Sequence, residues 1–464
     1  MNIFIFHRDY RLFDNTTLIE MSKKEGTITP IFIFTPEQIT KKNKYRSNNS
    51  VQFLIESLFE LKESIKEYKG KIHFFYGNYM DVIKSFKNVN SIGFNFDYSP
   101  YAIKRDTMIK KYCNKNNIKF YCKEDYLLYD ILDNDTMNKS GTPYTVFTPY
   151  KKHCLQNLIV RKPNKYNNFK FSNNNINNNI NNKYIINDMK MKSFYIENKD
   201  INVRGGRSNG LKILKNIQNW KDYNKLRDCM IYKTTFMSAY LHFNVLSIRE
   251  VFYRIIKKLG INNNLINELH WRDFYVNIMY FFPKVLIGMK KGKNKSFREK
   301  YDKIQWTKNK KHFDAWKKGM TGFPIVDACM RQMNKTGYMH NRGRMIVASF
   351  LVKNLNIDWR EGEKYFAQTL VDYDPSSNNG GWQWTSGGGT DAQPYFRIFN
   401  PWTQSKKFDP NCKYIKFWIP ELKNVDNNDI HKWNIKYNDS YIKPIVEHKK
   451  TREYTLKIFK KYLN

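Results

Sequence analysis

The C-terminal half of the chain contains GYMHNRGRMIVASFLVKN (337–354), VDYDPSSNNGGWQWTSGGGTDAQPYFRIFNP (371–401) and TQSKKFD (403–409). Tryptophans, paired acids, an Asn-Asn-Gly-Gly run and several arginines fall together in this stretch. Asn and Gly allow a backbone to turn tightly and to approach a ligand closely. Trp and Arg stack on flat rings, and Arg also grips phosphate. The pattern predicts a loop that holds a flat, polar and charged molecule.

This stretch resembles the photolyase and cryptochrome family, most closely the class I cyclobutane pyrimidine dimer photolyases. The matching motifs are HNR (340–342), Arg344-Met345, DYD (372–374), NNGGWQW (378–384) and PYFRIFNP (394–401). A core of aromatic helices with a Gly-rich connection does not explain the polar residues between the tryptophans. The resemblance implies light-dependent repair of cyclobutane dimers in DNA, by electron transfer from excited, reduced FAD to a flipped-out dimer. It covers nearly the whole chain and is sharpest from 264 to 420.

The composition independently favours a nucleic-acid partner. The 464 residues allow two or three domains, and a net charge of +38 with a pI near 9.7 points to a polyanion, most simply DNA. Part of this excess can instead come from the lysine and asparagine usage of an A+T-rich genome. The runs Lys290–Lys295 and Lys308–Lys311 fit solvated loops and DNA contacts equally well.

Cysteine usage and the N-terminus indicate where the protein works. The six cysteines are scattered without C-x-x-C spacing, which predicts a reducing intracellular compartment, cytoplasm or nucleus, without structural disulfides or a zinc site. The opening MNIFIFHRDYRLFDN places charges directly after a short apolar run, so it predicts a strand and not a signal peptide. No run approaches the ~18 apolar residues of a membrane span.

Residues 1–128 are predicted to form an α/β domain with a doubly wound parallel sheet. Short apolar or aromatic runs alternate with helical patterns such as Val51–Tyr68. The predicted strands are Ile3–Phe6, Pro30–Phe34, Lys71–Tyr76, Ser91–Phe96 and Ile118–Cys122. This half has no G-x-G-x-x-G, so a dinucleotide-binding interpretation lacks its phosphate loop.

Residues 129–205 are predicted to be an interdomain linker. Ser140–Tyr144 and Val146–Tyr150 resemble a family signature within it, and the Asn-rich tract Phe171–Asp188 predicts a surface loop or a disordered insert. Residues 206–464 are predicted to form a large all-α domain that binds FAD and DNA. Its clearest helical patterns are Ser247–Leu259, Asn264–Phe282, Pro324–Asn334, Asn341–Lys353 and Glu361–Leu370.

The resemblance assigns residues to one FAD per chain. It places the adenine and phosphate contacts at Tyr223, Thr234, Thr235, Phe236, Met237 and Ser238, although the family usually has Arg-Leu where Phe236-Met237 stand. It places the isoalloxazine contacts at Arg272, Arg344, Asp372, Asp374 and Asn378, with Arg344 paired to Asp372. Asn378 would face the flavin N5 and accept its hydrogen. From the residues alone, Asp372 and Asp374 can also be helix caps.

A second group of residues is assigned to the lesion. A dimer must leave the duplex to reach a buried flavin. By resemblance, Glu268 hydrogen-bonds the dimer, Trp271 and Trp384 form its apolar walls, and Asn341 and Met345 line the pocket. The (6-4) photolyases carry histidines at these last two positions, so cyclobutane dimers are the expected lesion. For the DNA strand, the candidate contacts are Arg227, Arg272, Asn341, Arg342, Arg397, Gln404, Lys406 and Lys407.

Two further features concern light and electrons. Trp382, Trp359 and Trp306 match the family's relay from flavin to surface, although a single Trp is usually core packing. Folate antennas in related photolyases use an Asn-Glu pair where this chain has Tyr101-Ala102. The antenna alternatives are therefore methenyltetrahydrofolate, a deazaflavin, a second flavin or an empty site.

Two other functions are considered. A cryptochrome photoreceptor shares the fold, but plant cryptochromes carry Asp and animal ones Cys where Asn378 stands, and the chain ends at Asn464 without a long signalling tail. A basic, non-catalytic DNA-binding protein leaves the flavin motif unexplained. We expect a monomer without a membrane or an obligate protein partner, whose substrate is UV-damaged DNA.

Overall fold

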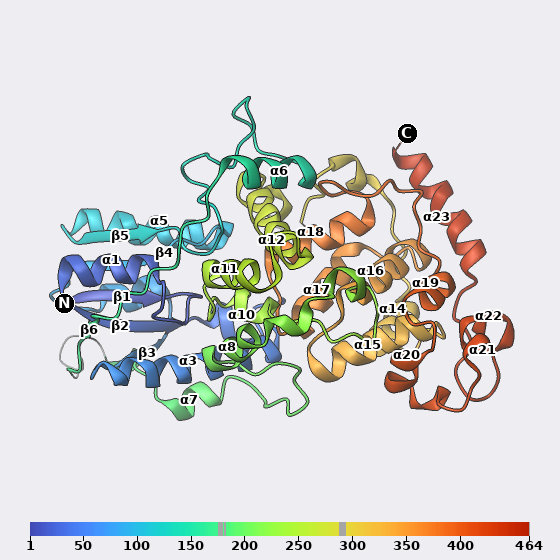
Figure 1. Ribbon diagram of the computed structural model, residues 1–464, viewed down its shortest axis with the longest axis horizontal. Coiled ribbons are helices and arrows are strands. Elements are labelled where there is room, and N and C mark those ends of the chain that lie inside the picture. The colour runs from blue at the N-terminus through green and yellow to red at the C-terminus, as the bar shows by residue number, and fades with distance from the viewer. Residues whose placement is uncertain (175–179, 181, 287–293, 464) are drawn as a thin grey trace. The chain divides into compact units, whose positions relative to one another are not determined.

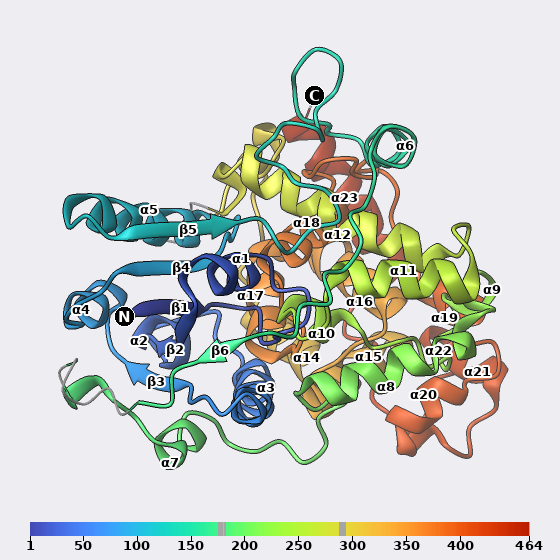
Figure 2. The same ribbon diagram turned by 60° about the vertical axis from the view of Figure 1, so that its left-hand side comes forward.

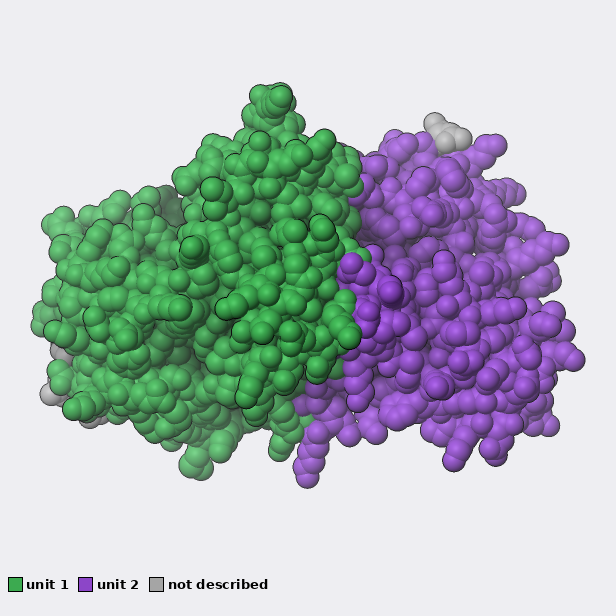
Figure 3. Space-filling model, viewed as in Figure 1, with its two compact units in different colours: residues 1–198, 203–221, 235–281 green, residues 199–202, 222–234, 282–464 purple. Residues whose placement is uncertain are grey.

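The computed structural model describes residues 1–174, 180, 182–286 and 294–463 (Figures 1 and 2). Residues 175–179 and 181 of the Asn-rich tract, and 290–293 of the first lysine run, lie outside the described residues. The chain divides into two compact units (Figure 3). Unit 1 comprises 1–198, 203–221 and 235–281, and unit 2 comprises 199–202, 222–234 and 282–464.

Unit 1 is built on a six-stranded sheet in which every pairing between strands is parallel. The strands are β1 (Asn2–Phe6), β2 (Thr27–Phe34), β3 (His73–Tyr76), β4 (Ser91–Asn95), β5 (Lys119–Lys123) and β6 (Lys170–Phe171). Their order is β3-β2-β1-β4-β5, with β6 paired to β2. The chain therefore moves outward from β1 in one direction and then returns to the other side, as a doubly wound fold requires. The predicted fold class and all five predicted strands are confirmed.

Helices cover both faces of this sheet. On one face, α4 and α5 pack on the isoleucines of β1 and β2. On the other face, α1 lies against β4 so closely that a Cβ on Gly93 would meet the Met21 sulfur at 2.1 Å. The helices of unit 1 are α1 (Thr16–Glu25), α2 (Pro36–Ile39), α3 (Asn48–Glu67), α4 (Tyr79–Lys84), α5 (Pro100–Lys115), α6 (Phe147–Asn157), η2 (Asn182–Tyr184), α7 (Asp188–Lys192), α8 (Arg207–Lys215), η3 (Ile217–Trp220), α10 (Ser238–His242), α11 (Ile248–Leu259) and α12 (Asn264–Phe281).

A buried charge network joins α11 to the edge of the sheet. Ser247 and Glu250 form a capping box that fixes the start of α11. Arg249 then donates from Nε to Asp14 at 2.7 Å and from Nη2 to Asp125 at 2.8 Å. Burial raises the pKa of Asp125, but the guanidinium groups of Arg11 and Arg249 outweigh it and hold that pKa below its ordinary value. Residues 235–281 consequently cluster with the α/β part, whereas the boundaries at 128/129 and 205/206 stay predictions.

The described residues of unit 2 form helices joined by loops, without a β-strand. Its helices are α9 (Tyr223–Leu226), η4 (Glu299–Lys303), α14 (Lys310–Lys318), α15 (Pro324–Thr336), α16 (Asn341–Ser349), η5 (Phe350–Asn354), α17 (Trp359–Thr369), α18 (Pro375–Ser386), α19 (Pro401–Phe408), α20 (Lys413–Trp418), η6 (Pro420–Leu422), α21 (Asn427–His431), α22 (Trp433–Lys436) and α23 (His448–Leu463). The helix predicted at Asn341–Lys353 is α16 continued by the π-helical turn η5.

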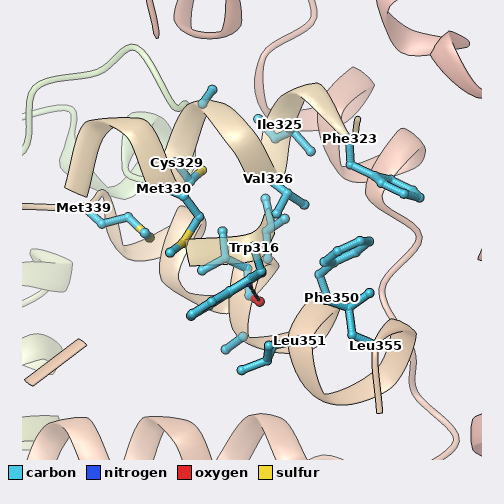
Figure 4. Close-up of a cluster of buried hydrophobic side chains, with 14 of the residues drawn as sticks. Trp316, Phe323, Ile325, Val326, Cys329, Met330, Met339, Phe350, Leu351 and Leu355 are labelled. Atoms are coloured by element: carbon cyan, nitrogen blue, oxygen red, sulfur yellow. Dashed lines mark hydrogen bonds between the residues drawn. The ribbon is translucent and has the colours of Figure 1, made fainter. Parts of the chain in front are cut away.

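The core of unit 2 forms where α14, α15, α16 and η5 meet (Figure 4). Trp316 lies at its centre, fully buried, and donates from Nε1 to the carbonyl of Val347 at 3.0 Å. Phe323 and Phe350 pack against each other with ring centroids 4.6 Å apart. Because this core is aromatic and continuous, it gives α16, α17 and α18 a rigid support.

The Asn- and Gly-rich segment 375–386, which the sequence predicted as a loop, is helix α18. That prediction was wrong, for a local reason: Asp374 caps the helix by accepting from the backbone N–H groups of Ser376 and Ser377 at 3.1 and 3.0 Å. Pro375 at the first helical position suits the dihedral angles there. The cap and the packing of α18 on α17 outweigh the ~1 kcal/mol that each glycine costs a helix.

Candidate flavin and DNA site

In unit 1, the predicted lesion residues share one face of α12. Glu268, Trp271, Arg272 and Tyr275 follow the i, i+3, i+4, i+7 spacing of a single helix face, and all four are half-buried. Other residues of the same helix, among them Leu269, Phe274 and Ile278, are buried. The structure thus brings together the acid, the Trp and the Arg that the sequence predicted. It adds Tyr275, which the helical spacing could have identified.

Contacts within unit 1 fix two of these side chains. Arg272 donates from Nη1 to the carbonyl of Tyr126 at 2.7 Å and also reaches the neighbouring Asp273 at 3.2 Å. Burial raises the pKa of Asp273 to about 7, against the lowering effect of Arg272. Trp271 stacks on Phe147 with ring centroids 3.6 Å apart and planes 7° apart. Arg272 is therefore anchored to backbone, and its predicted flavin or phosphate contact stays a prediction.

The predicted adenine and phosphate segment is a turn with a short helix behind it. Phe236 has a positive φ of 54°, and the Thr235 hydroxyl accepts from Met237 N at 3.4 Å. Ser238 begins α10, which has five residues, so the helix contributes little dipole to an anion there. Thr234, in unit 2, lies 3.1 Å from the hydroxyl of Tyr338. Tyr223 is buried at the start of α9.

In unit 2, the first turn of α16 carries Asn341, Arg344 and Met345, of which Asn341 is exposed and the other two half-buried. The predicted pair of Arg344 and Asp372 is confirmed: Nη2 donates to the two carboxylate oxygens at 2.8 and 3.1 Å. Burial lowers the Arg344 pKa, but Asp372 outweighs it and raises that pKa overall. His340 caps the helix through Nδ1, which accepts from Arg342 N at 3.1 Å, and burial lowers its pKa to about 4. A neutral imidazole can therefore serve as the cap.

Helix α18 packs on α16 and presents a half-buried face of its own. Asp374, Asn378, Gly381 and Trp384 lie along this face at helical spacing. A Cβ added to Gly381 would meet no atom within 4 Å, so the face is open at its midpoint. A planar group can approach the backbone closely at this point, between the predicted flavin contact Asn378 and the predicted lesion wall Trp384.

The amide of Asn378 has a fixed orientation. Its Nδ2 donates to the carbonyl oxygen of Glu363 at 3.1 Å, and only a nitrogen can make that contact. The Glu363 carboxyl in turn accepts from Asn379 at 2.9 Å and from Asn294 at 3.0 Å. Burial raises the Glu363 pKa to about 7. Among the described residues no group donates to Oδ1 of Asn378, so this oxygen stays available as the acceptor that the predicted N5 contact requires.

The predicted cations at the DNA-facing rim differ in how they are held. Arg342 donates to Asp228 at 2.8 Å and lies 4.4 Å from the Phe408 ring centroid. Arg397, Lys406 and Lys407 are exposed, while Arg227 and Gln404 are half-buried. Exposed lysines and arginines can meet phosphate without giving up an ion pair, whereas Arg342 would have to share its charge with Asp228.

The three predicted relay tryptophans belong to the core of unit 2. Trp382 and Trp359 are buried and Trp306 is half-buried at the rim of the cluster. Trp382 presses on α17, because a Cβ on Gly362 would meet its ring at 2.1 Å, one turn beyond Trp359. Trp382 also lies edge-on to Phe366 at 5.0 Å and to Trp316 at 6.2 Å. Neither Phe366 nor Trp316 was predicted to lie beside Trp382, although Trp316 follows Phe313 by three residues on the amphipathic helix α14.

Several other observations bear on the sequence predictions. Tyr101 is nearly half exposed on the first turn of α5, and Ala102 beside it is buried. All six cysteines are free thiols. Among the described residues, we find no helix with the length and apolar character needed to cross a bilayer.

The residues present fit a flavin. Unit 2 offers an open helix face at Gly381, an amide acceptor at Asn378 and a guanidinium–carboxylate pair at Arg344 and Asp372. A flat ring with polar edges needs such a surface: apolar where its plane lies, with donors and acceptors at the rim.

Comparisons with known proteins agree with this geometry. Residues 2–166 match the family model described as DNA photolyase, and residues 265–461 match the FAD binding domain of DNA photolyase. The deoxyribodipyrimidine photo-lyase of Buchnera aphidicola (subsp. Baizongia pistaciae) is 36% identical over 99% of this chain and 98% of its own. The protein of that name from Escherichia coli is 46% identical over 51% of each chain.

Solved structures give the same result. A photolyase from Sulfolobus tokodaii, solved with two FAD molecules, is 36% identical, covers 99% of this chain and 100% of its own, and superposes with a TM-score of 0.85. A Synechocystis cryptochrome is 26% identical, with 99% coverage of each chain and a TM-score of 0.85. The chain belongs to the DNA photolyase family.

Proposed function

We propose that this protein uses blue light to split cyclobutane pyrimidine dimers in DNA, which makes it a deoxyribodipyrimidine photo-lyase. The observation that carries the proposal is the open face of α18, where Asn378 and Trp384 flank Gly381. Similarity over nearly the full length to proteins that bear this name supports it. When bound, reduced and photoexcited FAD supplies the electron that splits the dimer.

On the flavin side, the chain's own residues would orient and polarise the cofactor. Asn378 would accept a hydrogen bond from the ring through Oδ1, because Nδ2 is spent on Glu363. An amide accepts there without adding a negative charge, which suits a reduced, anionic ring. Arg344 and Asp372 would border the ring, and Asp374 would combine a helix-capping role with a cofactor contact. Thr234 and Tyr223, and on unit 1 Thr235–Ser238, would hold the remainder.

On the lesion side, Glu268 would hydrogen-bond the dimer while Trp271 and Trp384 exclude water from it. Asn341 and Met345 would complete the pocket. A (6-4) product also needs a proton delivered to its hydroxyl, and neither Asn nor Met donates one at neutral pH. We therefore propose that the enzyme repairs cyclobutane dimers and leaves (6-4) products unchanged.

The test is a blue-light repair assay on matched oligonucleotides that contain either lesion, with dark controls. We expect thymines to be restored from the cyclobutane dimer alone. Glu268→Ala should weaken dimer binding and repair while FAD content is retained, and Glu453→Ala, at an exposed glutamate of α23, should change neither. Repair of the (6-4) oligonucleotide with the cyclobutane dimer left intact would contradict the assignment.

A photoreceptor function is the second candidate, because the Synechocystis cryptochrome shares the fold along its whole length. The same assay separates the two functions: a photoreceptor of this fold would absorb blue light without restoring thymines. The orientation of Asn378 as an amide acceptor supports repair.

The oligomeric state, the cellular compartment and the antenna are also proposals. We infer a monomer in the reducing cytoplasm or nucleus, without an obligate protein partner; the six free thiols are compatible with that compartment. For the antenna, Tyr101–Ala102 argues against methenyltetrahydrofolate and leaves a deazaflavin, a second flavin or an empty site. Gel filtration and extraction of chromophores from the purified protein test these points.

A further inference from the structure

The linker motif at Val146–Tyr150 has no role in the function described so far. In the structure it begins α6, which lies beside α12 in unit 1 (Figure 1). The first residue of α6, Phe147, is buried, although the neighbouring Val146 is exposed. The ring of Phe147 is buried at the exposed start of this helix because it packs on Trp271.

The linker contacts α12 along one stripe of residues. Lys151 donates to Asn267 at 3.2 Å, Phe147 stacks on Trp271 and lies edge-on to Phe274, and Thr136 donates to Asn277 at 2.9 Å. The α12 positions follow the i, i+4, i+7, i+10 spacing of one helix face. The linker therefore fixes the rotation of α12 about its axis as well as its position.

Trp271 belongs to this stripe and also to the half-buried face with Glu268. At 100° per residue, position 271 stands about 40° from position 267, toward position 268. One face of the indole is covered by Phe147 at 3.6 Å, and the side chain still remains half-buried rather than fully buried. The exposed part of the Trp271 side chain is thus available to a ligand, while Phe147 supports the covered face of its ring.

We propose that Phe147 is a positioning residue for lesion binding: it holds the indole plane of Trp271 against the flipped dimer. The inference rests on the proposed function. Near-parallel rings at this separation are less favourable than offset or edge-on pairs, so the surrounding contacts impose the arrangement. A Trp that is fixed in advance loses less rotamer freedom when the lesion binds, and this raises affinity.

The test measures the equilibrium binding of a dimer-containing duplex and of the same duplex without damage. Phe147→Leu should raise Kd for the damaged duplex about threefold to tenfold, the range expected for one aromatic pair, and leave the undamaged Kd unchanged. Phe147→Tyr keeps the aromatic ring and should bind the damaged duplex with wild-type affinity. Phe169→Leu is the matched control, because Phe169 is equally buried and stacks on Phe171 in the same unit.

A double-mutant cycle distinguishes positioning from general structure. In a Trp271→Ala background, Phe147→Leu should change the damaged-duplex Kd less than twofold, since the residue it positions is gone. A full effect in that background, or equal loss for both duplexes, would overturn the inference. A wild-type protein with no preference for the dimer would instead refute the proposed function. An unchanged Tm and an unchanged FAD content show that the variants are folded. Phe147→Tyr can still be measured if Phe147→Leu does not fold.

Discussion

The ion pair of Arg344 and Asp372 allows a quantitative test of how unit 2 holds its cofactor-facing residues. The Asp372 side chain is 2% exposed and that of Arg344 26%. Arg344 donates hydrogen bonds from Nη2 to both carboxylate oxygens of Asp372 and from Nε to the carbonyl oxygen of Met339 at 2.9 Å. Asp372→Asn preserves the size of the side chain and removes its charge. It leaves a guanidinium largely out of water without its counter-ion.

The magnitude follows from these contacts. A hydrogen bond to a charged group contributes roughly 1.5–3 kcal/mol, and breaking a fully buried pair costs about 3–5 kcal/mol. Because Arg344 keeps some exposure, we expect a loss near the lower end, about 2–3 kcal/mol of unfolding free energy. For a unit of this size, 1 kcal/mol shifts Tm by about 2–4 °C, so Tm should fall by about 5–10 °C.

A surface pair in the same unit provides the control. Arg331 donates from Nη1 to both oxygens of Glu421 at 2.8 and 2.9 Å, but Glu421 is 45% exposed. Exposed pairs contribute about 0–1 kcal/mol, so Glu421→Gln should shift Tm by no more than about 4 °C. Melting is followed by circular dichroism with and without added FAD, and Asp372→Asn should also release FAD more readily. Equal shifts in the two variants would refute the reasoning.

Three further predictions concern electrons, DNA and pH. Trp382→Phe should abolish the photoreduction of oxidised FAD but spare repair when the flavin is reduced chemically; normal photoreduction would remove Trp382 from the relay. Arg397→Ala should flatten the log–log salt dependence of DNA binding by up to about one unit, and Arg342→Ala by less because Asp228 already holds that side chain, as titrations from low to high salt would show. Burial raises the pKa of Glu363 to about 7. Between about pH 4.5 and 7 the folded protein therefore keeps a proton on Glu363 that the unfolded chain has released, so the unfolding free energy falls as pH rises through this range. Glu363→Gln should therefore flatten the fall of Tm between about pH 4.5 and 7, and parallel Tm curves for variant and wild type over this range would contradict this.

Much of the fold could be predicted because local pattern and burial agree. The strands β1 and β4 are short apolar runs that are buried almost throughout, so Ile3–Phe6 and Ser91–Phe96 were recognisable from the sequence alone. The helices α11, α12, α15 and α17 begin and end within about two residues of their predicted bounds. The Arg344–Asp372 pair was also predictable, through the family motif.

What could not be predicted depended on contacts between distant residues. The segment 375–386 contains Asn and Gly residues that disfavour a helix, and its packing on α17 outweighs them; only its N-cap at Asp374 is a local signal. The stack of Phe147 on Trp271 joins residues more than one hundred positions apart, and no period in the sequence encodes it. The same holds for Trp316 and Phe366 beside Trp382, since core packing selects them from many aromatic residues.

Because Arg249 pairs with Asp14 and Asp125, we expect that the gene cannot be divided into two independently folding parts at codon 206. A fragment that starts there would keep the guanidinium and lose both carboxylates, a cost of several kcal/mol if the site stayed buried. It would also uncover the stripe of α12 that α6 protects. We expect such a fragment to be insoluble when expressed, and chimaeras between relatives to fold only when all three segments of unit 1 are exchanged together.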